Sequence, residues 1–413
     1  MGLSVDEIIR VTKNLPILIV DDSTSYRRLL SRHLSSWSNY YTILEAEDGI
    51  QALEIIKEKS VGIVISDWEM PNMNGPELCR AVREATSHYV YFILVTSRGT
   101  SDDMILGMDA GADDFLTKPI NQQELRMRLR AGERILQLEA RLEEKNQSLN
   151  KAYQLIENDL KAAAEMQTSL LPQDELNIHQ IKCEWFFHPS LFVSGDMLNF
   201  FRLDHEYIGF YSVDVSGHGV KSAMLSVTLS RVLSHGSTNG LVKRKMVDFP
   251  YYCITPPAEV VSELNAQYQM TDHNTIYFTM VYGILNIWTG EGRLTRAGHP
   301  RPIIVHADGR VVVIDEGDVP VGFAVESAYQ EIPFYLEKGS RLYLYTDGIT
   351  ECENVSEELF GEDKMISLLK ADHQHTLNQT LINLQEELTD WRKELGKEGF
   401  DDDVSMLAIH FEG

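Results

Sequence analysis

The first 130 residues alternate short apolar segments with helical patterns, and this alternation restricts the possible fold more than any other feature. The apolar segments are residues 16–20, 41–44, 61–65, 89–95 and 114–116. Continuous apolar strands that are separated by helices form parallel sheets whose two faces are both covered. The sequence therefore predicts a doubly wound α/β domain in this part of the chain.

Polar side chains follow these apolar segments at the points where the strands are expected to end. Asp21 and Asp22 follow the first segment, Asp67 the third, Thr96 the fourth and Lys118 the fifth. Functional groups gather at the carboxyl ends of the strands in such sheets, and core packing does not explain charged residues at these positions. We therefore expect these five side chains to form one site.

The motifs around these residues read PILIVDD, VISDWEMPNMNG, LVTS and FLTKP. Over about residues 14–130 they resemble the receiver domain of response regulators. The resemblance implies that a sensor histidine kinase is the upstream partner and that the Asp67 carboxylate accepts the phosphoryl group as a nucleophile. It also implies a Mg²⁺ ion that offsets the phosphoryl charge. Its ligands would be Asp21, Asp22, Asp67 and the backbone carbonyl of Glu69.

Three further positions match the residues that respond to phosphorylation in receiver domains. Lys118 would pair with the phosphoryl oxygens, and the Thr96 hydroxyl would donate a hydrogen bond to one of them. Phe115 matches the switch aromatic of the family, and a plain core residue is the alternative at this position. The sequence does not indicate whether phosphorylation activates or inhibits the rest of the chain.

A strand followed by an acidic, glycine-rich turn is expected at residues 208–220. Asp214 stands where the apolar run stops, and Gly217 and Gly219 flank His218 in the turn. Glycines let backbone carbonyls approach a ligand, and hard cations prefer oxygen ligands. An ordinary Asp-Gly turn is the alternative for this stretch alone.

Three more acidic turns favour a metal site over an ordinary turn. Asp196, Asp347 and Asp402 each stand at the edge of an expected strand, so the four carboxylates could converge on one pocket. No histidine or cysteine accompanies them at zinc spacing, which favours Mg²⁺ or Mn²⁺ over zinc. Two such ions that share one carboxylate can clamp a phosphate and activate water for its hydrolysis.

Six motifs in this half of the chain read SGD, DVSGHGV, AGHPRP, PVG, YTDGITE and DDDVS. In this order, and over roughly residues 160–413, they resemble the type-2C metal-dependent serine/threonine phosphatases. The similarity is strongest to the bacterial branch that governs stress-response and sporulation sigma factors. Ser194 and Met197 stand where a glycine and an aromatic residue are common in the family.

This second resemblance implies two Mn²⁺ or Mg²⁺ ions and a catalytic set made of Asp214, Asp347 and Asp402. Asp214 would bridge both ions. Asp347 and Asp402 would hold one of them, and Asp196 would hold or orient the other. The backbone carbonyl after Asp214, that of Val215, would be a further ligand. For His218 the resemblance implies a proton donor to the leaving group, and a simple turn residue is the alternative.

Residues 121–171 contain no proline, a single glycine and many good helix formers. Apolar residues recur every seven positions, at 135, 142, 149, 156, 163 and 170. A heptad seam with charged flanks predicts a two-stranded coiled coil and hence a homodimer. A single amphipathic helix that lies on its own domain is the alternative.

Composition restricts the partners and the location. The net charge of −25 argues against nucleic acid as a partner, because the phosphates would be repelled. The four cysteines are scattered without CxxC spacing, which predicts a reduced, cytoplasmic protein. No apolar run reaches membrane-spanning length, so we expect no membrane association.

Two polar stretches have less specific interpretations. Residues 236–257 are rich in turn residues and contain Lys243-Arg244-Lys245. A solvated connecting loop is favoured there, and a lid or a contact for a protein substrate is the alternative. His373 and His375 have no evident acidic or cysteine partner, so we expect them on the surface.

The sequence as a whole predicts a signalling enzyme with a receiver, a helical linker and an α+β phosphatase that is built around stacked β-sheets. We expect it to hydrolyse phosphoserine or phosphothreonine on a protein without a covalent intermediate. The resemblance implies a phosphorylated anti-sigma antagonist of the STAS type as substrate. A receiver-controlled scaffold that captures a partner without turnover is the alternative. The expected boundaries are a tail over 1–13, the receiver over 14–130, the coiled-coil linker over 131–171 and the phosphatase over 172–413.

Overall fold

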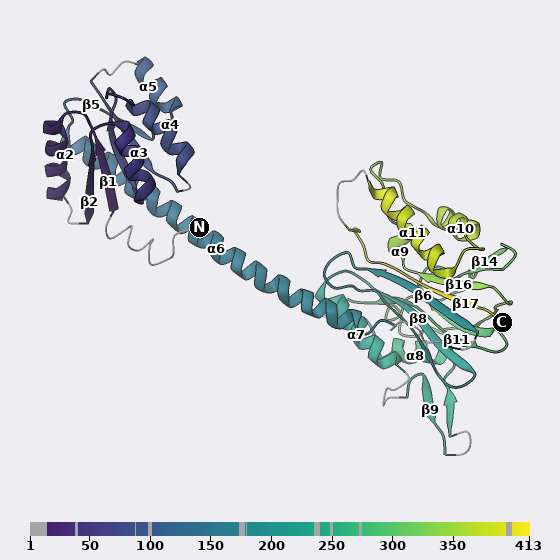
Figure 1. The fold of residues 1–413 in the computed structure, drawn as a ribbon. Helices are drawn as coiled ribbons and strands as arrows, with labels where there is room; N and C mark the ends of the chain where they lie inside the picture. Colours follow the sequence, from purple (N-terminus) through teal and green to yellow (C-terminus); the bar gives the residue numbers. More distant parts are fainter. Residues whose placement is uncertain are drawn as a thin grey trace. The chain divides into compact units, whose positions relative to one another are not determined.

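A computed structural model provides the structure of the protein, and it divides the chain into two compact units, Met1–Leu155 and Ile156–Gly413 (Figure 1). None of the described helices is long and apolar enough to cross a membrane. The residues that the structure describes are 15–37, 40–86, 88–97, 101–172, 178, 180–234, 240–247, 251–271, 275–393 and 399–413.

The first unit contains a five-stranded parallel sheet with the strand order β2-β1-β3-β4-β5. This order confirms the predicted doubly wound α/β fold. The strands are β1 (Leu15–Val20), β2 (Tyr41–Ala46), β3 (Ile63–Asp67), β4 (Tyr91–Thr96) and β5 (Asp114–Thr117). The helices that belong to this unit alone are α2 (Thr24–Trp37), α3 (Gly49–Glu58), α4 (Gly75–Ala85) and α5 (Ser101–Asp109).

Both faces of this sheet are buried, which explains why its central strands are apolar along their whole length. Leu18 and Val64 pack into one core with Leu78 and Val82 of α4. Successive strand residues point to opposite faces, so Ile17, Ile19, Ile63 and Ile65 enter a second core with Leu30 and Leu34 of α2. The carboxyl ends of the strands are left for polar groups.

The helix α6 (Gln122–Thr168) runs through the predicted linker. Leu125 and Leu129 near its start are fully buried in the receiver core. Its middle exposes apolar side chains, and Leu142 and Leu149 are 57% and 68% exposed. The predicted helix is therefore confirmed over these residues, whereas its pairing with a second copy stays a prediction.

The second unit contains two five-stranded antiparallel sheets, with the strand orders β15-β12-β11-β8-β7 and β14-β13-β16-β17-β6. The first sheet consists of β7 (Met197–Arg202), β8 (Tyr207–Val215), β11 (Phe278–Asn286), β12 (Glu291–Ala297) and β15 (Ile332–Tyr335). The second consists of β6 (Ile181–His188), β13 (Ile303–Val305), β14 (Val311–Val313), β16 (Arg341–Tyr345) and β17 (Val404–Phe411). The helices are α7 (Val220–Leu233), α8 (Pro257–Gln267), α9 (Asp347–Thr350), α10 (Glu362–Ala371) and α11 (Leu377–Arg392).

The two sheets are stacked face to face, as the sequence predicts. Phe210 of the first sheet and Leu342 and Leu344 of the second belong to one buried core. The alternate residues Tyr343 and Tyr345 point to the other face of the second sheet, where they share a separate core with α10 and α11. Helices α7 and α8 pack against the first sheet, so helices cover both outer faces (Figure 1).

The basic cluster at 243–245 lies in a β-hairpin, so the prediction of a connecting loop is wrong for this part. Strand β9 (Lys243–Lys245) pairs with β10 (Tyr252–Ile254). Lys243 donates to the carbonyl of Leu203 (2.9 Å), and Arg244 pairs with Glu259 (2.7 Å) on α8. These intramolecular contacts already engage both cations. Residues 235–239 and 248–250 lie outside the described part.

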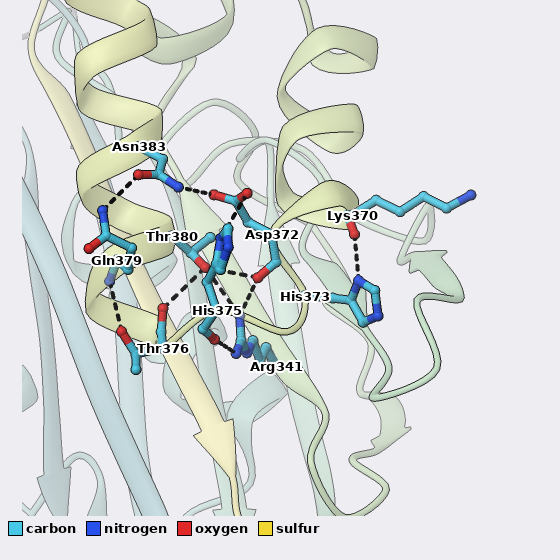
Figure 2. Close-up of polar contacts among 9 residues, drawn as sticks. All are labelled: Arg341, Lys370, Asp372, His373, His375, Thr376, Gln379, Thr380 and Asn383. Carbon is cyan, nitrogen blue, oxygen red and sulfur yellow. Dashed lines mark hydrogen bonds and ion pairs between the residues drawn. The ribbon is translucent and has the colours of Figure 1, made fainter.

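The segment that contains His373 and His375 connects α10 to α11, and a buried arginine donates hydrogen bonds to it (Figure 2). Arg341 of β16 donates to the carbonyl of Asp372 and to the hydroxyl of Thr380, both at 3.2 Å. His375 is exposed, as expected. The expectation that it has no acidic partner is wrong, because its Nδ1 lies 3.1 Å from Oδ1 of Asp372.

Candidate metal and phosphoryl-transfer sites

Three carboxylates gather at the carboxyl end of the receiver sheet. One oxygen each of Asp21, Asp22 and Asp67 lie within 4.8 Å of one another. Asp21 and Asp22 directly follow β1, and Asp67 is the last residue of β3, so the pairing of these two parallel strands brings them together. A cluster of carboxylate oxygens at a sheet edge is the donor set that Mg²⁺ prefers.

Lys118 completes this receiver site. Its Nζ lies 2.9 Å from Oδ2 of Asp21 and 2.9 Å from Oδ2 of Asp67. Burial raises the pKa of Asp67 above its ordinary value, and the Lys118 ammonium acts in the opposite direction. The three carboxylates and the Lys118 ammonium therefore stand together at one edge of the sheet, and the role of Asp67 as phosphoryl acceptor stays a prediction.

The other predicted receiver residues lie around this cluster. Thr96 ends β4 and is buried. Phe115 is half-buried, and its ring centroid lies 6.5 Å from that of Trp68, the residue after Asp67. This contact is compatible with both a switch residue and a core residue. The side chain of Glu69 is exposed.

A cavity of about 680 Å³ in the second unit brings together three of the predicted phosphatase carboxylates, those of Asp214, Asp347 and Asp402. Asp214 lies near the end of β8, and Asp402 precedes β17. The strand that was expected to end on Asp347 ends at Tyr345, and Asp347 begins the short helix α9. His218 also lines the cavity and is exposed.

Burial and mutual repulsion perturb these carboxylates. Burial, followed by the charges of Asp347 and Asp402, raises the pKa of Asp214 to about 7. Burial and the neighbouring Glu351 raise the pKa of Asp347 to about 6. Carboxylates that share a poorly solvated cavity favour protonation or a bound cation. The donor set therefore fits hard divalent ions.

The fourth predicted carboxylate, Asp196, is not among the described residues that line the cavity. Its side chain is 1% exposed and accepts a hydrogen bond from the Thr346 hydroxyl (2.8 Å). Burial, and then the charges of Asp214 and Asp403, raise its pKa well above the ordinary value. Among the described residues, three ligand oxygens within 4.8 Å of one another occur only in the receiver, so the phosphatase carboxylates are less tightly grouped.

Asp403 is a further buried acid of this region, and the sequence does not distinguish it from the other two aspartates of the triplet at 401–403. It is buried and accepts hydrogen bonds from the backbone N–H groups of Ser190 and Gly195, both at 2.8 Å. Asp402, by contrast, is exposed. Asp401 and Asp402 of the triplet line the cavity, whereas Asp403 holds the segment that contains Asp196.

Two glycines let the acidic segments pack against each other. A Cβ at Gly195 would lie 2.8 Å from the carbonyl oxygen of Val215, and a Cβ at Gly348 would lie 2.1 Å from the carbonyl oxygen of Asp403. Both distances are shorter than real contacts of a Cβ atom. The backbone beside Asp196 therefore lies directly against Val215, and the backbone beside Asp347 lies against the aspartate triplet.

Gln167 near the end of α6 is a second residue that the sequence analysis missed. It is 2% exposed and exchanges two hydrogen bonds with the backbone of Ser194. Its Nε2 also lies 3.0 Å from the Ser226 hydroxyl on α7. A polar residue in a helix with an exposed seam gives no sequence signal of such burial.

Comparisons with known proteins agree with both units. Residues 204–412 match the family model described as Stage II sporulation protein E (SpoIIE), and residues 17–130 match the response regulator receiver domain. The response regulator MprA of Mycobacterium ulcerans is 40% identical over 123 residues, which are 30% of this chain and 52% of MprA. The chain thus spans about half the length of the curated relatives it matches.

One solved structure shows the same fold for the second unit. The SiaA-PP2C domain of Pseudomonas aeruginosa superposes with a TM-score of 0.51 at 18% identity, over 63% of this chain and 98% of that domain. The PP2C phosphatase domain of SpoIIE from Bacillus subtilis matches at 15% identity and a TM-score of 0.45, over 56% of this chain and 63% of that one. The SpoIIE model covers more than half of the sequence, so the chain belongs to the SpoIIE family and carries a receiver domain at its N-terminal side.

Proposed function

We propose that this protein is a response regulator whose second unit hydrolyses phosphoserine or phosphothreonine on a protein. The observation that carries the proposal is the cavity shared by Asp214, Asp347 and Asp402. The raised pKa values of Asp214 and Asp347 indicate negative charge that lacks compensation. Divalent cations compensate such charge, and two of them can clamp a phosphate and activate water for phosphomonoester hydrolysis at neutral pH.

The chain's own residues would divide the work within this cavity. Asp214, Asp347 and Asp402, with the backbone carbonyl of Val215, would hold two Mn²⁺ or Mg²⁺ ions. When bound, the ions supply positive charge for the phosphoryl group and acidify water. Asp196, which is held by the Thr346 hydroxyl, would bind or orient the ion on its side. His218 at the rim is available as a proton donor for the leaving serine or threonine oxygen.

The receiver would control this activity. A sensor histidine kinase would phosphorylate Asp67, with Mg²⁺ held by Asp21, Asp22 and Asp67 and by the carbonyl of Glu69. Lys118 already contacts both Asp21 and Asp67, so it would transfer its contact to the new phosphoryl oxygens. Thr96 and Phe115 would then respond to the modified site. These partners act in the cytoplasm, which is the location that we propose.

A homodimer is part of the proposal. The apolar residues Leu138, Leu142, Leu149 and Ile156 are all more than half exposed on α6, and they follow the heptad seam. Burying such a seam against a second copy removes apolar surface from water. The linker pairing would then reach the phosphatase through the end of α6, where Gln167 contacts Ser194.

The substrate that we propose is a phosphorylated antagonist protein of the STAS type. Membership of the SpoIIE family supports this choice, because the related bacterial phosphatases act on sigma-factor regulators. The fold by itself does not determine a substrate. The net charge of −25 disfavours nucleic acid as a partner.

The purified protein should release phosphate from p-nitrophenyl phosphate and from a phosphoserine-bearing STAS protein when Mn²⁺ is present, and EDTA should stop both reactions. Acetyl phosphate should phosphorylate Asp67 and thereby change the rate at which phosphate is released from the STAS protein. A protein that binds the STAS partner with Mn²⁺ but releases no phosphate from either substrate would be a scaffold, and the proposal would be wrong.

A further inference from the structure

A buried histidine contacts two hydroxyl groups of the first sheet, and one of these belongs to a residue that lines the phosphatase cavity. His299 is 1% exposed and follows β12 within the AGHPRP motif. Its Nδ1 lies 2.8 Å from the Thr279 hydroxyl, and its Nε2 lies 3.0 Å from the Ser212 hydroxyl. The ring also has a backbone contact with Tyr345 of the second sheet. His299 therefore lies between the two sheets.

Thr279 connects this buried group to the cavity. It lines the cavity together with Asp214, and the two residues are directly opposite each other in the pairing of β11 with β8. Directly paired residues of an antiparallel sheet have Cβ atoms about 4.5–5.5 Å apart on the same face. The Thr279 hydroxyl thus lies beside the carboxylate that is proposed to bridge both metal ions.

The protonation state of the ring follows from its surroundings. Burial and the nearby Arg296 lower the pKa of His299 to about 3, although the backbone contact with Tyr345 acts in the opposite direction. The imidazole is therefore neutral at physiological pH. A neutral imidazole carries one N–H, so one ring nitrogen donates and the other accepts.

The Ser212 hydroxyl determines which nitrogen donates. Ser212 is buried, and within the described part of the chain its hydroxyl has no hydrogen-bond partner other than Nε2 of His299. Buried donors are rarely left unsatisfied because an unmade hydrogen bond is costly. Ser212 therefore donates to Nε2, and the ring proton on Nδ1 is donated to the oxygen of Thr279. The hydroxyl proton of Thr279 then remains available for the cavity.

We propose that His299 is a positioning residue that turns the Thr279 hydroxyl toward the cavity, where Thr279 donates a hydrogen bond to a phosphoryl oxygen of the substrate. The inference rests on the proposed phosphatase function and adds a neutral donor to its charged groups. A threonine hydroxyl in the cavity wall adds a hydrogen-bond donor for phosphate without adding charge to the metal site.

Thr279→Val and Thr279→Ser form a matched pair that tests this donor. Valine keeps the β-branched shape but removes the hydroxyl, whereas serine keeps the hydroxyl. A hydrogen bond to a charged group corresponds to about 10–100-fold in binding. We expect Thr279→Val to weaken the binding of inorganic phosphate to the Mn²⁺-loaded protein by that factor, and kcat/KM for p-nitrophenyl phosphate to fall in parallel. Thr279→Ser should retain most of both.

The positioning role of His299 is tested by two substitutions, each of which places an amide near the position of one ring nitrogen. The amide of His299→Asn can replace the Nδ1 donor, whereas the longer His299→Gln reaches the Nε2 position. We expect His299→Asn to keep more phosphate affinity than His299→Gln, and either change to have little further effect in the Thr279→Val background. Mn²⁺ affinity by calorimetry should stay unchanged in all folded variants, because none of these residues is a proposed ligand.

Equal phosphate affinity in folded Thr279→Val and Thr279→Ser proteins would overturn the inference, as would a loss of Mn²⁺ affinity that accounts for the whole defect. If valine prevents folding, the comparison of His299→Asn with His299→Gln decides. A wild-type protein that hydrolyses no phosphomonoester contradicts the proposed function instead, and the phosphate-binding measurement still tests the Thr279 donor.

Discussion

The side-chain amide of Gln167 and the backbone of Ser194 form a closed pair of hydrogen bonds. The amide Nε2 donates to the Ser194 carbonyl at 2.7 Å, and the Ser194 N–H donates to Oε1 at 3.0 Å. The Ser194 hydroxyl in turn accepts from the backbone N–H of Asp196 at 2.9 Å. The last turns of α6 are thereby connected, through one residue, to the carboxylate behind the metal cavity.

This pair predicts that Gln167 sets the position of Asp196. Gln167→Leu leaves the buried N–H of Ser194 without its partner, at a cost of about 1–3 kcal/mol. The Ser194 carbonyl keeps only the weaker contact with the Ser226 hydroxyl (3.2 Å). We expect a lower melting temperature of the second unit and weaker Mn²⁺ binding by calorimetry. Gln154→Leu, at an exposed position on the same helix, is the control. Unchanged Mn²⁺ affinity in Gln167→Leu would show that the contact has only a structural role.

Asp214→Asn and Asp347→Asn should abolish most of the phosphatase activity. Each change removes a ligand of the proposed metal pair, and we expect turnover to fall by about two or more orders of magnitude. The same substitutions remove repulsion in the cavity, so the metal-free variants should melt at a higher temperature than the wild type at pH 8. Mn²⁺-dependent hydrolysis at the wild-type rate by either variant would refute the assignment.

The raised pKa values predict how the stability of the metal-free protein depends on pH. The pKa values of Asp214 and Asp347 are about 7 and about 6, against an ordinary value of 3.8, so the folded state binds protons more tightly than the unfolded chain. This contribution is full below pH 4 and is lost as the pH rises through 7. Thermal melts in EDTA should show a falling melting temperature across this window, and the slope should be smaller in Asp214→Asn. A melting temperature that rises with pH across this window, with the same slope in Asp214→Asn, would contradict the raised pKa values of Asp214 and Asp347.

Asp67 should be the residue that a small phosphodonor modifies. Acetyl phosphate with Mg²⁺ should label the wild-type protein, and Asp67→Ala should abolish the label because its carboxylate is the proposed nucleophile. Mass spectrometry of the intact protein measures the added phosphoryl group. Asp113→Ala, which removes a receiver acid that is already engaged by Arg83 (2.7 Å), serves as the control and should still be labelled. If Asp67→Ala is still labelled, another carboxylate is the phosphoryl acceptor.

The dimer seam can be tested with two leucines of α6 that have similar exposure. Leu149 is 68% exposed and lies on the heptad seam, whereas Leu155 is 64% exposed and lies off it. We expect Leu149→Asp to shift the protein to monomers in light scattering, because a charge in the seam is not solvated in the paired state. Leu155→Asp should remain dimeric. Equal behaviour of the two variants would exclude this seam as the dimer interface.

The sequence predicts best what short-range patterns determine. Asp21, Asp67 and Asp214 are each expected at a strand end. The strands that position them are short apolar runs, which can be recognised from neighbouring residues alone. Asp403 could not be separated from Asp402, because its role depends on a contact with Gly195, 208 residues away in sequence. Gln167 was missed for the same reason.

Local composition also predicted some segments wrongly. The basic run at Lys243 and Arg244 resembles a solvated loop, because its acidic partners Glu259 and Glu263 belong to a later helix. His375 was expected to lack an acidic partner, although Asp372 stands three residues earlier, since only the turn between α10 and α11 directs the two side chains toward each other.

The close backbone contacts of Gly195 and Gly348 have a consequence for how this enzyme tolerates mutation. Every single-nucleotide missense change of a glycine codon introduces a side chain, and at these positions any side chain would separate two acidic segments. A random-mutagenesis screen for lost phosphatase activity should therefore recover both codons as often as those of Asp214 and Asp347. A sequence library that diversifies the cavity should hold the two glycines fixed and vary the residues around them.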